Sequence, residues 1–303
     1  MTESVTHAAN DVPYGVAPPG YRLPAATTVG PVTLQVADLA RSIDYYERIL
    51  GLRVLRGSPQ SATLGTQDRS TPLVILRARP GATPVPKRGR LGLYHFAILL
   101  PSRAALGRFV RHLADAKVYA GMSDHLVSEA IYLTDPDGLG IEVYADRPRG
   151  EWRHEGRQLV MATEPLDVQD VLRAAGGERW SGMPAGAVLG HVHLFVGDLE
   201  AASRFYHAGL GFDKVVWSYP GALFLSAGGY HHHLGTNTWA AGAEPAGEAD
   251  AQLLEWEIRV PSADDATAAL ESLRGAGAAV ERAEDGGVAR DPWGTAVRVR
   301  SAA

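Results

Sequence analysis

The feature that most constrains the fold of this chain is a repeat that relates its two halves. The segment GPVTLQVADLARSIDYYERILGLRV, beginning at Gly30, resembles GHVHLFVGDLEAASRFYHAGLGFDKV, beginning at Gly190. Asp38 corresponds to Asp198 with the same offset of 160 residues, and the Pro-Ser pair at 101–102 recurs with that offset at 261–262. A pattern repeated at one fixed offset indicates a duplicated chain.

Each half is itself doubled. The strands expected at Pro31 and His95 begin 64 residues apart, as do those expected at His191 and Glu255. The chain therefore contains four modules, which begin near these four residues.

One module has the order βαβββ. The alternating run 32–36 predicts a strand, Asp38 is a favourable N-cap, and the helix 39–50 ends before Gly51. Short β-type runs follow, with a turn at the Asp-Pro-Asp-Gly sequence 135–138 in the second module. The inner face of such a sheet is apolar, so two modules must pair. The expected fold is α+β, with the modules paired into two half-barrels whose sheets are cup-shaped.

The chain divides into four parts on this basis. Residues 1–26 form an N-terminal extension, 27–149 a first domain of modules one and two, and 188–303 a second domain of modules three and four. The polar, Gly- and Pro-rich stretch 150–187 between them is a linker with one short helix, Val168–Ala175.

Composition excludes several classes of function. A formal net charge of −5 argues against nucleic acid or an anionic membrane as the main partner, and no apolar run approaches the length of a membrane span. The nearest approach to a basic cluster is Lys87, Arg88 and Arg90, which we interpret as a solvated loop. With no cysteine, metal ligands are limited to His, Asp and Glu, and a cytoplasmic protein is expected.

Particular strings carry a resemblance to a known family: GLYHFAILLPSR, SDHLVSEAIYLTDPDG, GIEVYADRP, GHVHL and GYHHHLGTNTW. With the four modules, they make the chain similar to the vicinal oxygen chelate superfamily. That superfamily includes glyoxalase I, bleomycin-resistance proteins and extradiol dioxygenases. The strings resemble most the Bacillus CatE-type branch of catechol 2,3-dioxygenases, over roughly residues 20–300. One scaffold of this kind hosts several functions.

The resemblance implies metal ligands on the first and last strands of facing modules. His95, Glu142 and His191 make a two-histidine, one-carboxylate set that suits Fe(II), and Mn(II) fits almost as well. This set closes only if module two faces module three. A competing set lies wholly in the second half: His191, His232, which strand alternation favours over its neighbours, and Glu255. The sequence leaves open which modules pair, and therefore which set is right.

Further residues are expected around the metal. His125 and His193 are candidate acid–base groups that would take a proton from a catechol hydroxyl. An apolar wall for an aromatic ring is expected from five aromatic side chains, Trp217, Tyr219, Phe224, Trp239 and Tyr144.

Three functions compete on these grounds. The first is Fe(II)-dependent extradiol cleavage of a catechol-like aromatic diol, with O2 as co-substrate. The second is a glyoxalase-like isomerase or thiol transferase, which would need Glu142 and Glu255 to share one cup with the histidines. The third is a non-catalytic protein that binds an aromatic ligand, as drug-resistance proteins do. A homo-oligomer is compatible with all three.

Overall fold

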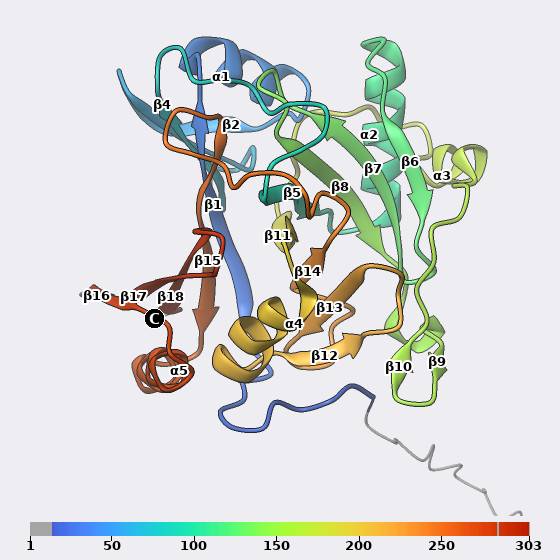
Figure 1. Cartoon of the computed structure of the whole chain (residues 1–303). Helices are drawn as coiled ribbons and strands as arrows, with labels where there is room; N and C mark the ends of the chain where they lie inside the picture. Colours follow the sequence, from blue (N-terminus) through green and yellow to red (C-terminus); the bar gives the residue numbers. More distant parts are fainter. Residues whose placement is uncertain (1–13, 284, 303) are drawn as a thin grey trace, which may run out of the picture.

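Two curled eight-stranded sheets form the body of the protein in a computed structural model that describes residues 14–283 and 285–302 (Figure 1). The strand orders are β16-β17-β18-β15-β1-β4-β3-β2 and β12-β13-β14-β11-β5-β8-β7-β6. The first sheet contains β1 (Thr28–Val36), β2 (Arg53–Ser58), β3 (Ser61–Gly65), β4 (Pro72–Ala78), β15 (Gln252–Val260), β16 (Val280–Ala283), β17 (Gly286–Arg290) and β18 (Ala296–Ser301). The second contains β5 (Gly92–Leu99), β6 (Gly121–Asp124), β7 (Ser128–Thr134), β8 (Gly140–Asp146), β11 (Val188–Phe195), β12 (Asp213–Val216), β13 (Ala222–Ser226) and β14 (Leu234–Asn237).

The sheets answer the pairing question that the sequence left open. Antiparallel pairing of β1 with β15 joins the first module to the fourth, and antiparallel pairing of β5 with β11 joins the second to the third. The expected α+β fold with two cup-shaped sheets is confirmed. The halves 27–149 and 188–303 of the sequence each contribute one module to each sheet.

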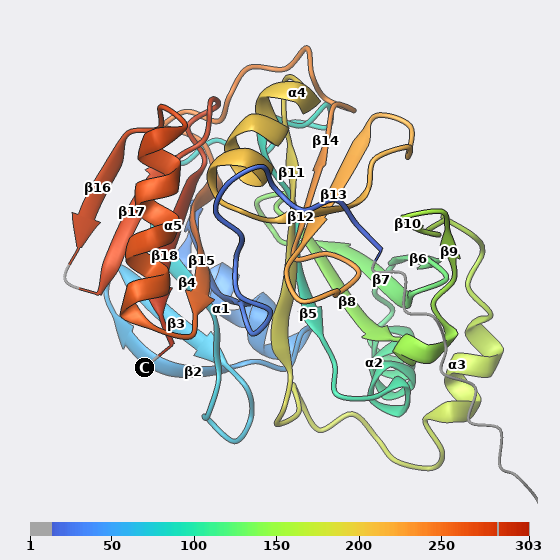
Figure 2. The ribbon, with the colours of Figure 1, turned by 90° about the horizontal axis from the view of Figure 1, so that it is seen from below.

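The module helices begin where the repeat predicts. They are α1 (Leu39–Arg48), α2 (Arg103–Asp115), α4 (Leu199–Ala202), which continues as the π-helix η2 (Ser203–Gly209), and α5 (Ala263–Gly275). Their N-caps are Asp38, Ser102, Asp198 and Ser262, and each cap side chain accepts a hydrogen bond from a backbone N–H of the first turn. Figure 2 shows α5 of the fourth module packed beside the α4–η2 helix of the third. The strands of these two modules lie in different sheets, so this contact joins the two sheets.

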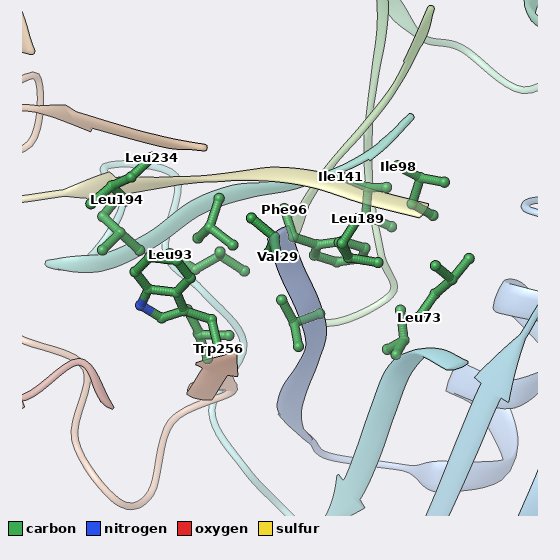
Figure 3. Close-up of a cluster of buried hydrophobic side chains, with 14 of the residues drawn as sticks. Val29, Leu73, Leu93, Phe96, Ile98, Ile141, Leu189, Leu194, Leu234 and Trp256 are labelled. Carbon is green, nitrogen blue, oxygen red and sulfur yellow. The ribbon is translucent and has the colours of Figure 1, made fainter. Parts of the chain in front are cut away.

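A continuous apolar core lies between the two sheets. Alternation along β5 turns Phe96 and Ile98 toward this core, where Figure 3 shows them near Val29 of β1 and Leu189 of β11. Trp256 of β15 is fully buried in the same cluster. The same alternation turns His95, Ala97 and Leu99 toward the cup of the second sheet, whereas Leu93, beyond a register shift, packs in the core. The core therefore fixes which side chains face the cup.

The segment between the halves is more structured than a linker. It contains η1 (Arg149–Glu151), the short hairpin strands β9 (His154–Glu155) and β10 (Gln158–Leu159), and α3 (Val168–Ala174), which packs against α2. Of the expected N-terminal extension 1–26, residues 1–13 lie outside the described residues. Within the described part of the chain, no helix is long and apolar enough to cross a membrane.

Candidate metal centre

Three neighbouring strands of the second sheet bring a histidine and a carboxylate together. Ala97 of β5 pairs with His191 of β11 on one side and with Glu142 of β8 on the other. These three residues form one row across the sheet, and His95 lies two positions along β5 on the same face. Since Ala97 carries only a methyl group, the longer side chains on either side of it can meet above the sheet.

The side chains converge on one carboxylate oxygen. His95 Nε2 lies 3.0 Å and His191 Nε2 3.2 Å from Oε2 of Glu142. One ligand atom from each residue lies within 4.8 Å of the others, and all three residues are buried. The sequence proposed this trio as one of two sets, and the pairing of modules two and three is what assembles it.

The protonation states suit a metal ligand set. Burial lowers the pKa of His191 to about 4, so its imidazole is neutral near pH 7. Burial alone would raise the pKa of Glu142, but His191 and His95 beside it hold that pKa well below its usual value. The site therefore presents two imidazoles and one carboxylate.

Buried nitrogen atoms without hydrogen-bond partners also fit a metal site. Among the described residues, Nδ1 of His95 and Nδ1 of His191 have no hydrogen-bond partner, and the approach of His95 Nε2 to Glu142 lacks the geometry of a hydrogen bond, although all three nitrogens are buried. Buried polar groups are rarely left this way without a ligand or water. Two histidines and a carboxylate that leave other positions open are the donor set that non-haem Fe(II) takes, so these residues fit the metal that the family resemblance implies.

The competing set is not brought together. Glu255 lies on β15 in the other sheet, where its carboxylate accepts hydrogen bonds of 2.7 and 3.0 Å from Arg298. Through the repeat, Glu255 corresponds to His95 and Arg298 to Glu142, since Glu257 pairs with Arg298 as Ala97 pairs with Glu142. An ion pair thus occupies in the first sheet the place that the trio occupies in the second.

A cavity of about 190 Å³ opens beside the trio, with His95 and Glu142 in its wall. Of the aromatic residues expected to form its walls, Tyr219, Phe224 and Trp239 line it. Trp217, 39% exposed, and Tyr144, whose hydroxyl meets that of Tyr230 at 2.7 Å, do not line this cavity.

The two proposed acid–base histidines both line the cavity, and they differ in their hydrogen-bond partners. His125 Nδ1 donates to the carbonyl of Ala162 (2.7 Å), so its Nε2 accepts from the hydroxyl of Tyr132 (2.6 Å). Asn237 Oδ1 accepts from a backbone N–H, which turns its Nδ2 toward His193 Nε2 at 3.0 Å. The lone pair of His193 is therefore engaged by an amide donor, and its Nδ1 carries the hydrogen.

A chain of hydrogen bonds ends at His232, which also lines the cavity. Asp146 accepts from His231 Nε2 at 2.9 Å, and His231 Nδ1 meets His232 Nδ1 at 2.8 Å. Because Asp146 fixes the hydrogen of His231 on Nε2, Nδ1 of His231 accepts and Nδ1 of His232 donates. Among the described residues, none donates to Nε2 of His232, which keeps a free lone pair, and its ring packs at a tilt against that of His191 with centroids 4.0 Å apart.

Sequence reasoning missed part of the cavity wall. Residues 161–163 of the inter-half segment line it, and so does Tyr94. The segment is held there by the bond from His125 to Ala162 and by Thr163 Oγ1, 3.0 Å from the hydroxyl of Tyr219. No periodic pattern marks such a segment, whereas Tyr94 could have been noted as the neighbour of His95.

The fold and site define a class: proteins in which two βαβββ modules share one cup-shaped sheet with a candidate metal centre inside. The chain belongs to the Glyoxalase/Bleomycin resistance protein/Dioxygenase superfamily, whose family model matches residues 28–143 and 188–299. The resemblance seen in the sequence is thereby confirmed.

Individual relatives agree with this membership. A catechol-2,3-dioxygenase of Bacillus subtilis (strain 168) is 41% identical over 270 residues, which cover 88% of this chain and 94% of the relative. A Bacillus subtilis subsp. subtilis str. 168 structure, named as a candidate dioxygenase, superposes with a TM-score of 0.64 at 14% identity, covering 93% of this chain and 86% of its own. Glyoxalase I from Zea mays gives 0.54 at 18%, covering 91% and 92%. These two structures show the fold alone.

Proposed function

We propose that this protein is an extradiol dioxygenase that uses Fe(II), held by His95, Glu142 and His191, to cleave a catechol-like aromatic diol with O2. The observation that carries the proposal is the convergence of these three buried ligand atoms within 4.8 Å, with His95 and Glu142 in the wall of an aromatic-lined cavity. The Bacillus subtilis relative named as a catechol-2,3-dioxygenase supports it, because 41% identity spans nearly both chains. In the overall reaction, the ring bond next to the diol breaks and both atoms of O2 enter the product.

The bound Fe(II) would supply open coordination positions and electron exchange, which O2 chemistry requires. The rest of the task falls to the chain. Tyr219, Phe224 and Trp239 would hold the aromatic ring and exclude water from its faces. With about 190 Å³, the cavity suits a single ring, being smaller than the typical pocket for a drug-sized ligand.

Proton transfer falls to histidines with a free or exchangeable position. His232 is the best placed base, because its Nε2 lone pair is unengaged and burial lowers its pKa well below the usual value, which keeps it neutral. From the opposite module, His125 would orient Tyr132, whose hydroxyl donates to it and would accept a hydrogen bond from a substrate hydroxyl. Burial, together with Glu142, raises the pKa of Tyr132 well above its usual value, so its hydroxyl stays protonated and keeps its bond to His125.

The isomerase alternative has less support. A second carboxylate was expected from Glu255, which instead pairs with Arg298 in the other sheet. Among the described residues that line the cavity, Glu142 is the sole carboxylate. The non-catalytic alternative predicts ligand binding that chelators leave undisturbed.

The test begins with protein purified under argon, with bound metals measured by mass spectrometry. Fe(II) and catechol are then added while oxygen uptake is followed. We expect one O2 consumed per catechol and a yellow semialdehyde product, both abolished by His191→Ala and by His95→Ala. Glu255→Gln is the matched control and should retain turnover.

Absence of oxygen uptake with every catechol, together with aromatic binding that survives chelation, would favour the binding protein. Turnover of thiol adducts without O2 would favour the isomerase. Turnover that survives His95→Ala but not Glu255→Gln would exclude the proposed ligand set.

A further inference from the structure

A second, much larger cleft of about 1160 Å³ adjoins the cavity. The two share Tyr94, His95, Tyr132 and Trp239 in their walls, so a molecule bound at the candidate metal centre has a direct way into the cleft. Trp239, 51% exposed, stands at the junction. A monocyclic diol fills only the smaller space, which leaves the larger one without an assigned occupant.

Backbone hydrogen bonds hold the walls of the cleft in place. One wall is the segment joining β4 to β5 and another is the segment joining β14 to β15, which lie side by side (Figure 1). Backbone hydrogen bonds from Thr83 to Ala249 (2.8 Å) and from Leu91 to Glu244 (3.1 Å) tie the two segments together at both ends. Val85 N–H also donates to the carbonyl of Asp137 in the β7–β8 turn (2.9 Å).

The residues that line the cleft are apolar or basic. Leu93, Ile141 and Phe195 provide apolar surface next to the junction. Farther out stand Lys87 and Arg88, and the described residues that line the cleft include no aspartate or glutamate. Within residues 14–283 and 285–302, no ion pair is formed by either cation, whereas the neighbouring Arg90 pairs with Asp250 at 3.1 Å. Although the whole chain has a net charge of −5, these two unpaired cations give the cleft a local positive potential, which attracts anions.

We propose that this cleft is a substituent subsite, and that the preferred substrate is an aromatic diol with an apolar spacer ending in an anionic group, such as a carboxylate. The ring lies in the cavity, the spacer crosses the apolar junction, and the anionic end meets Lys87 and Arg88. The inference rests on the proposed function, which supplies the diol. It gives the basic loop with Lys87 and Arg88, interpreted from the sequence as merely solvated, a role in binding.

The experiment compares matched catechols: 3-(3,4-dihydroxyphenyl)propionate against 4-propylcatechol, and 3-(2,3-dihydroxyphenyl)propionate against 3-propylcatechol. For at least one pair, kcat/KM should favour the anionic member by about tenfold, as expected from two exposed charged contacts. The double variant Lys87→Ala/Arg88→Ala should remove that preference, and so should high ionic strength. The control Arg56→Ala/Arg282→Ala removes two exposed charges from the other sheet and should keep it.

Dissociation constants from calorimetry on the metal-depleted protein give a second readout without turnover. If the anionic preference appears in binding while no diol is cleaved, the subsite stands and the proposed function fails. If catechols are cleaved with no anionic preference at either ring position, or if the Arg56/Arg282 control loses the preference as fully as the Lys87/Arg88 variant, the subsite is overturned and the proposed function stands.

Discussion

Replacing Glu142 by glutamine should abolish the stabilisation of the protein by Fe(II). Glu142 is the single carboxylate of the trio and the point on which both histidine Nε2 atoms converge, at 3.0 and 3.2 Å. A glutamine has nearly the same size but no charge. The matched variant is Glu255→Gln, which removes the carboxylate at the repeat-equivalent position of His95 in the other sheet, where Arg298 holds it.

The expected magnitudes follow from linkage. With free Fe(II) at 100 times its dissociation constant, a metal bound only by the folded state adds about 2.7 kcal/mol, or about 4 °C in Tm for a chain of 303 residues. Loss of a direct ligand should weaken binding by at least about 100-fold, since even second-shell substitutions cost about 10–100-fold. At the same Fe(II) concentration the gain then falls to about 0.4 kcal/mol, or about 0.6 °C.

Thermal unfolding under argon, with and without Fe(II), measures these shifts, and Mn(II) in place of Fe(II) checks them without redox chemistry. Wild type and Glu255→Gln should show the full metal-induced shift, and Glu142→Gln almost none. A full shift in Glu142→Gln combined with its loss in Glu255→Gln would refute the assignment of the ligand set.

Three further predictions follow from the same geometry. Ala97→Leu should lower bound metal per folded monomer, because the larger side chain fills the gap between the ligands, and should cost about 1–3 kcal/mol in urea unfolding. Asp146→Asn should lower kcat about tenfold with metal content unchanged, since it frees the histidine pair that it orients at 2.9 Å; equal kcat would contradict that role. The metal-depleted protein should lose stability as pH falls below 6.5, because burial holds the pKa of His191 at about 4 and of His233 at about 3, while the unfolded histidines take up protons. Over that window His191 contributes about 3 kcal/mol and His233 about 5 kcal/mol of the loss. Asp135 and Asp291, whose pKa values burial raises to about 7 and about 6, oppose it by about 4 and about 3 kcal/mol. The buried His193 and His232, with pKa values well below the usual one, keep the net change a loss, and a flat profile in urea unfolding at several pH values would contradict it.

Much of the local structure could be predicted from the sequence, because short-range chemistry decides it. The N-caps Asp38 and Asp198 recur at one offset, and each accepts the backbone hydrogen bond that its position predicts. The pairing of modules could not be predicted in the same way. Each module has an apolar face and a first strand able to pair with another, and only long-range packing, such as that around Trp256, selects the partner.

A clue to the pairing was nevertheless present. Arg298 stands in the fourth module where Glu142 stands in the second, so the cup containing the fourth module has lost its carboxylate ligand. His232 was considered only as a metal ligand, because its neighbour His231 and the distant Asp146, which orient it, come together only in the folded chain. Residues 161–163 were read as linker because a segment without periodicity gives no sign of the cavity that it lines.

The central claim is that a metal lies among His95, Glu142 and His191, in the cup shared by modules two and three. An anomalous difference map, collected at the iron edge from crystals grown with Fe(II) under argon, tests it most directly. A single strong peak bonded to His95 Nε2, His191 Nε2 and a Glu142 oxygen is the predicted result. A peak beside Glu255, or no peak among the three residues in crystals shown to contain iron, would contradict it.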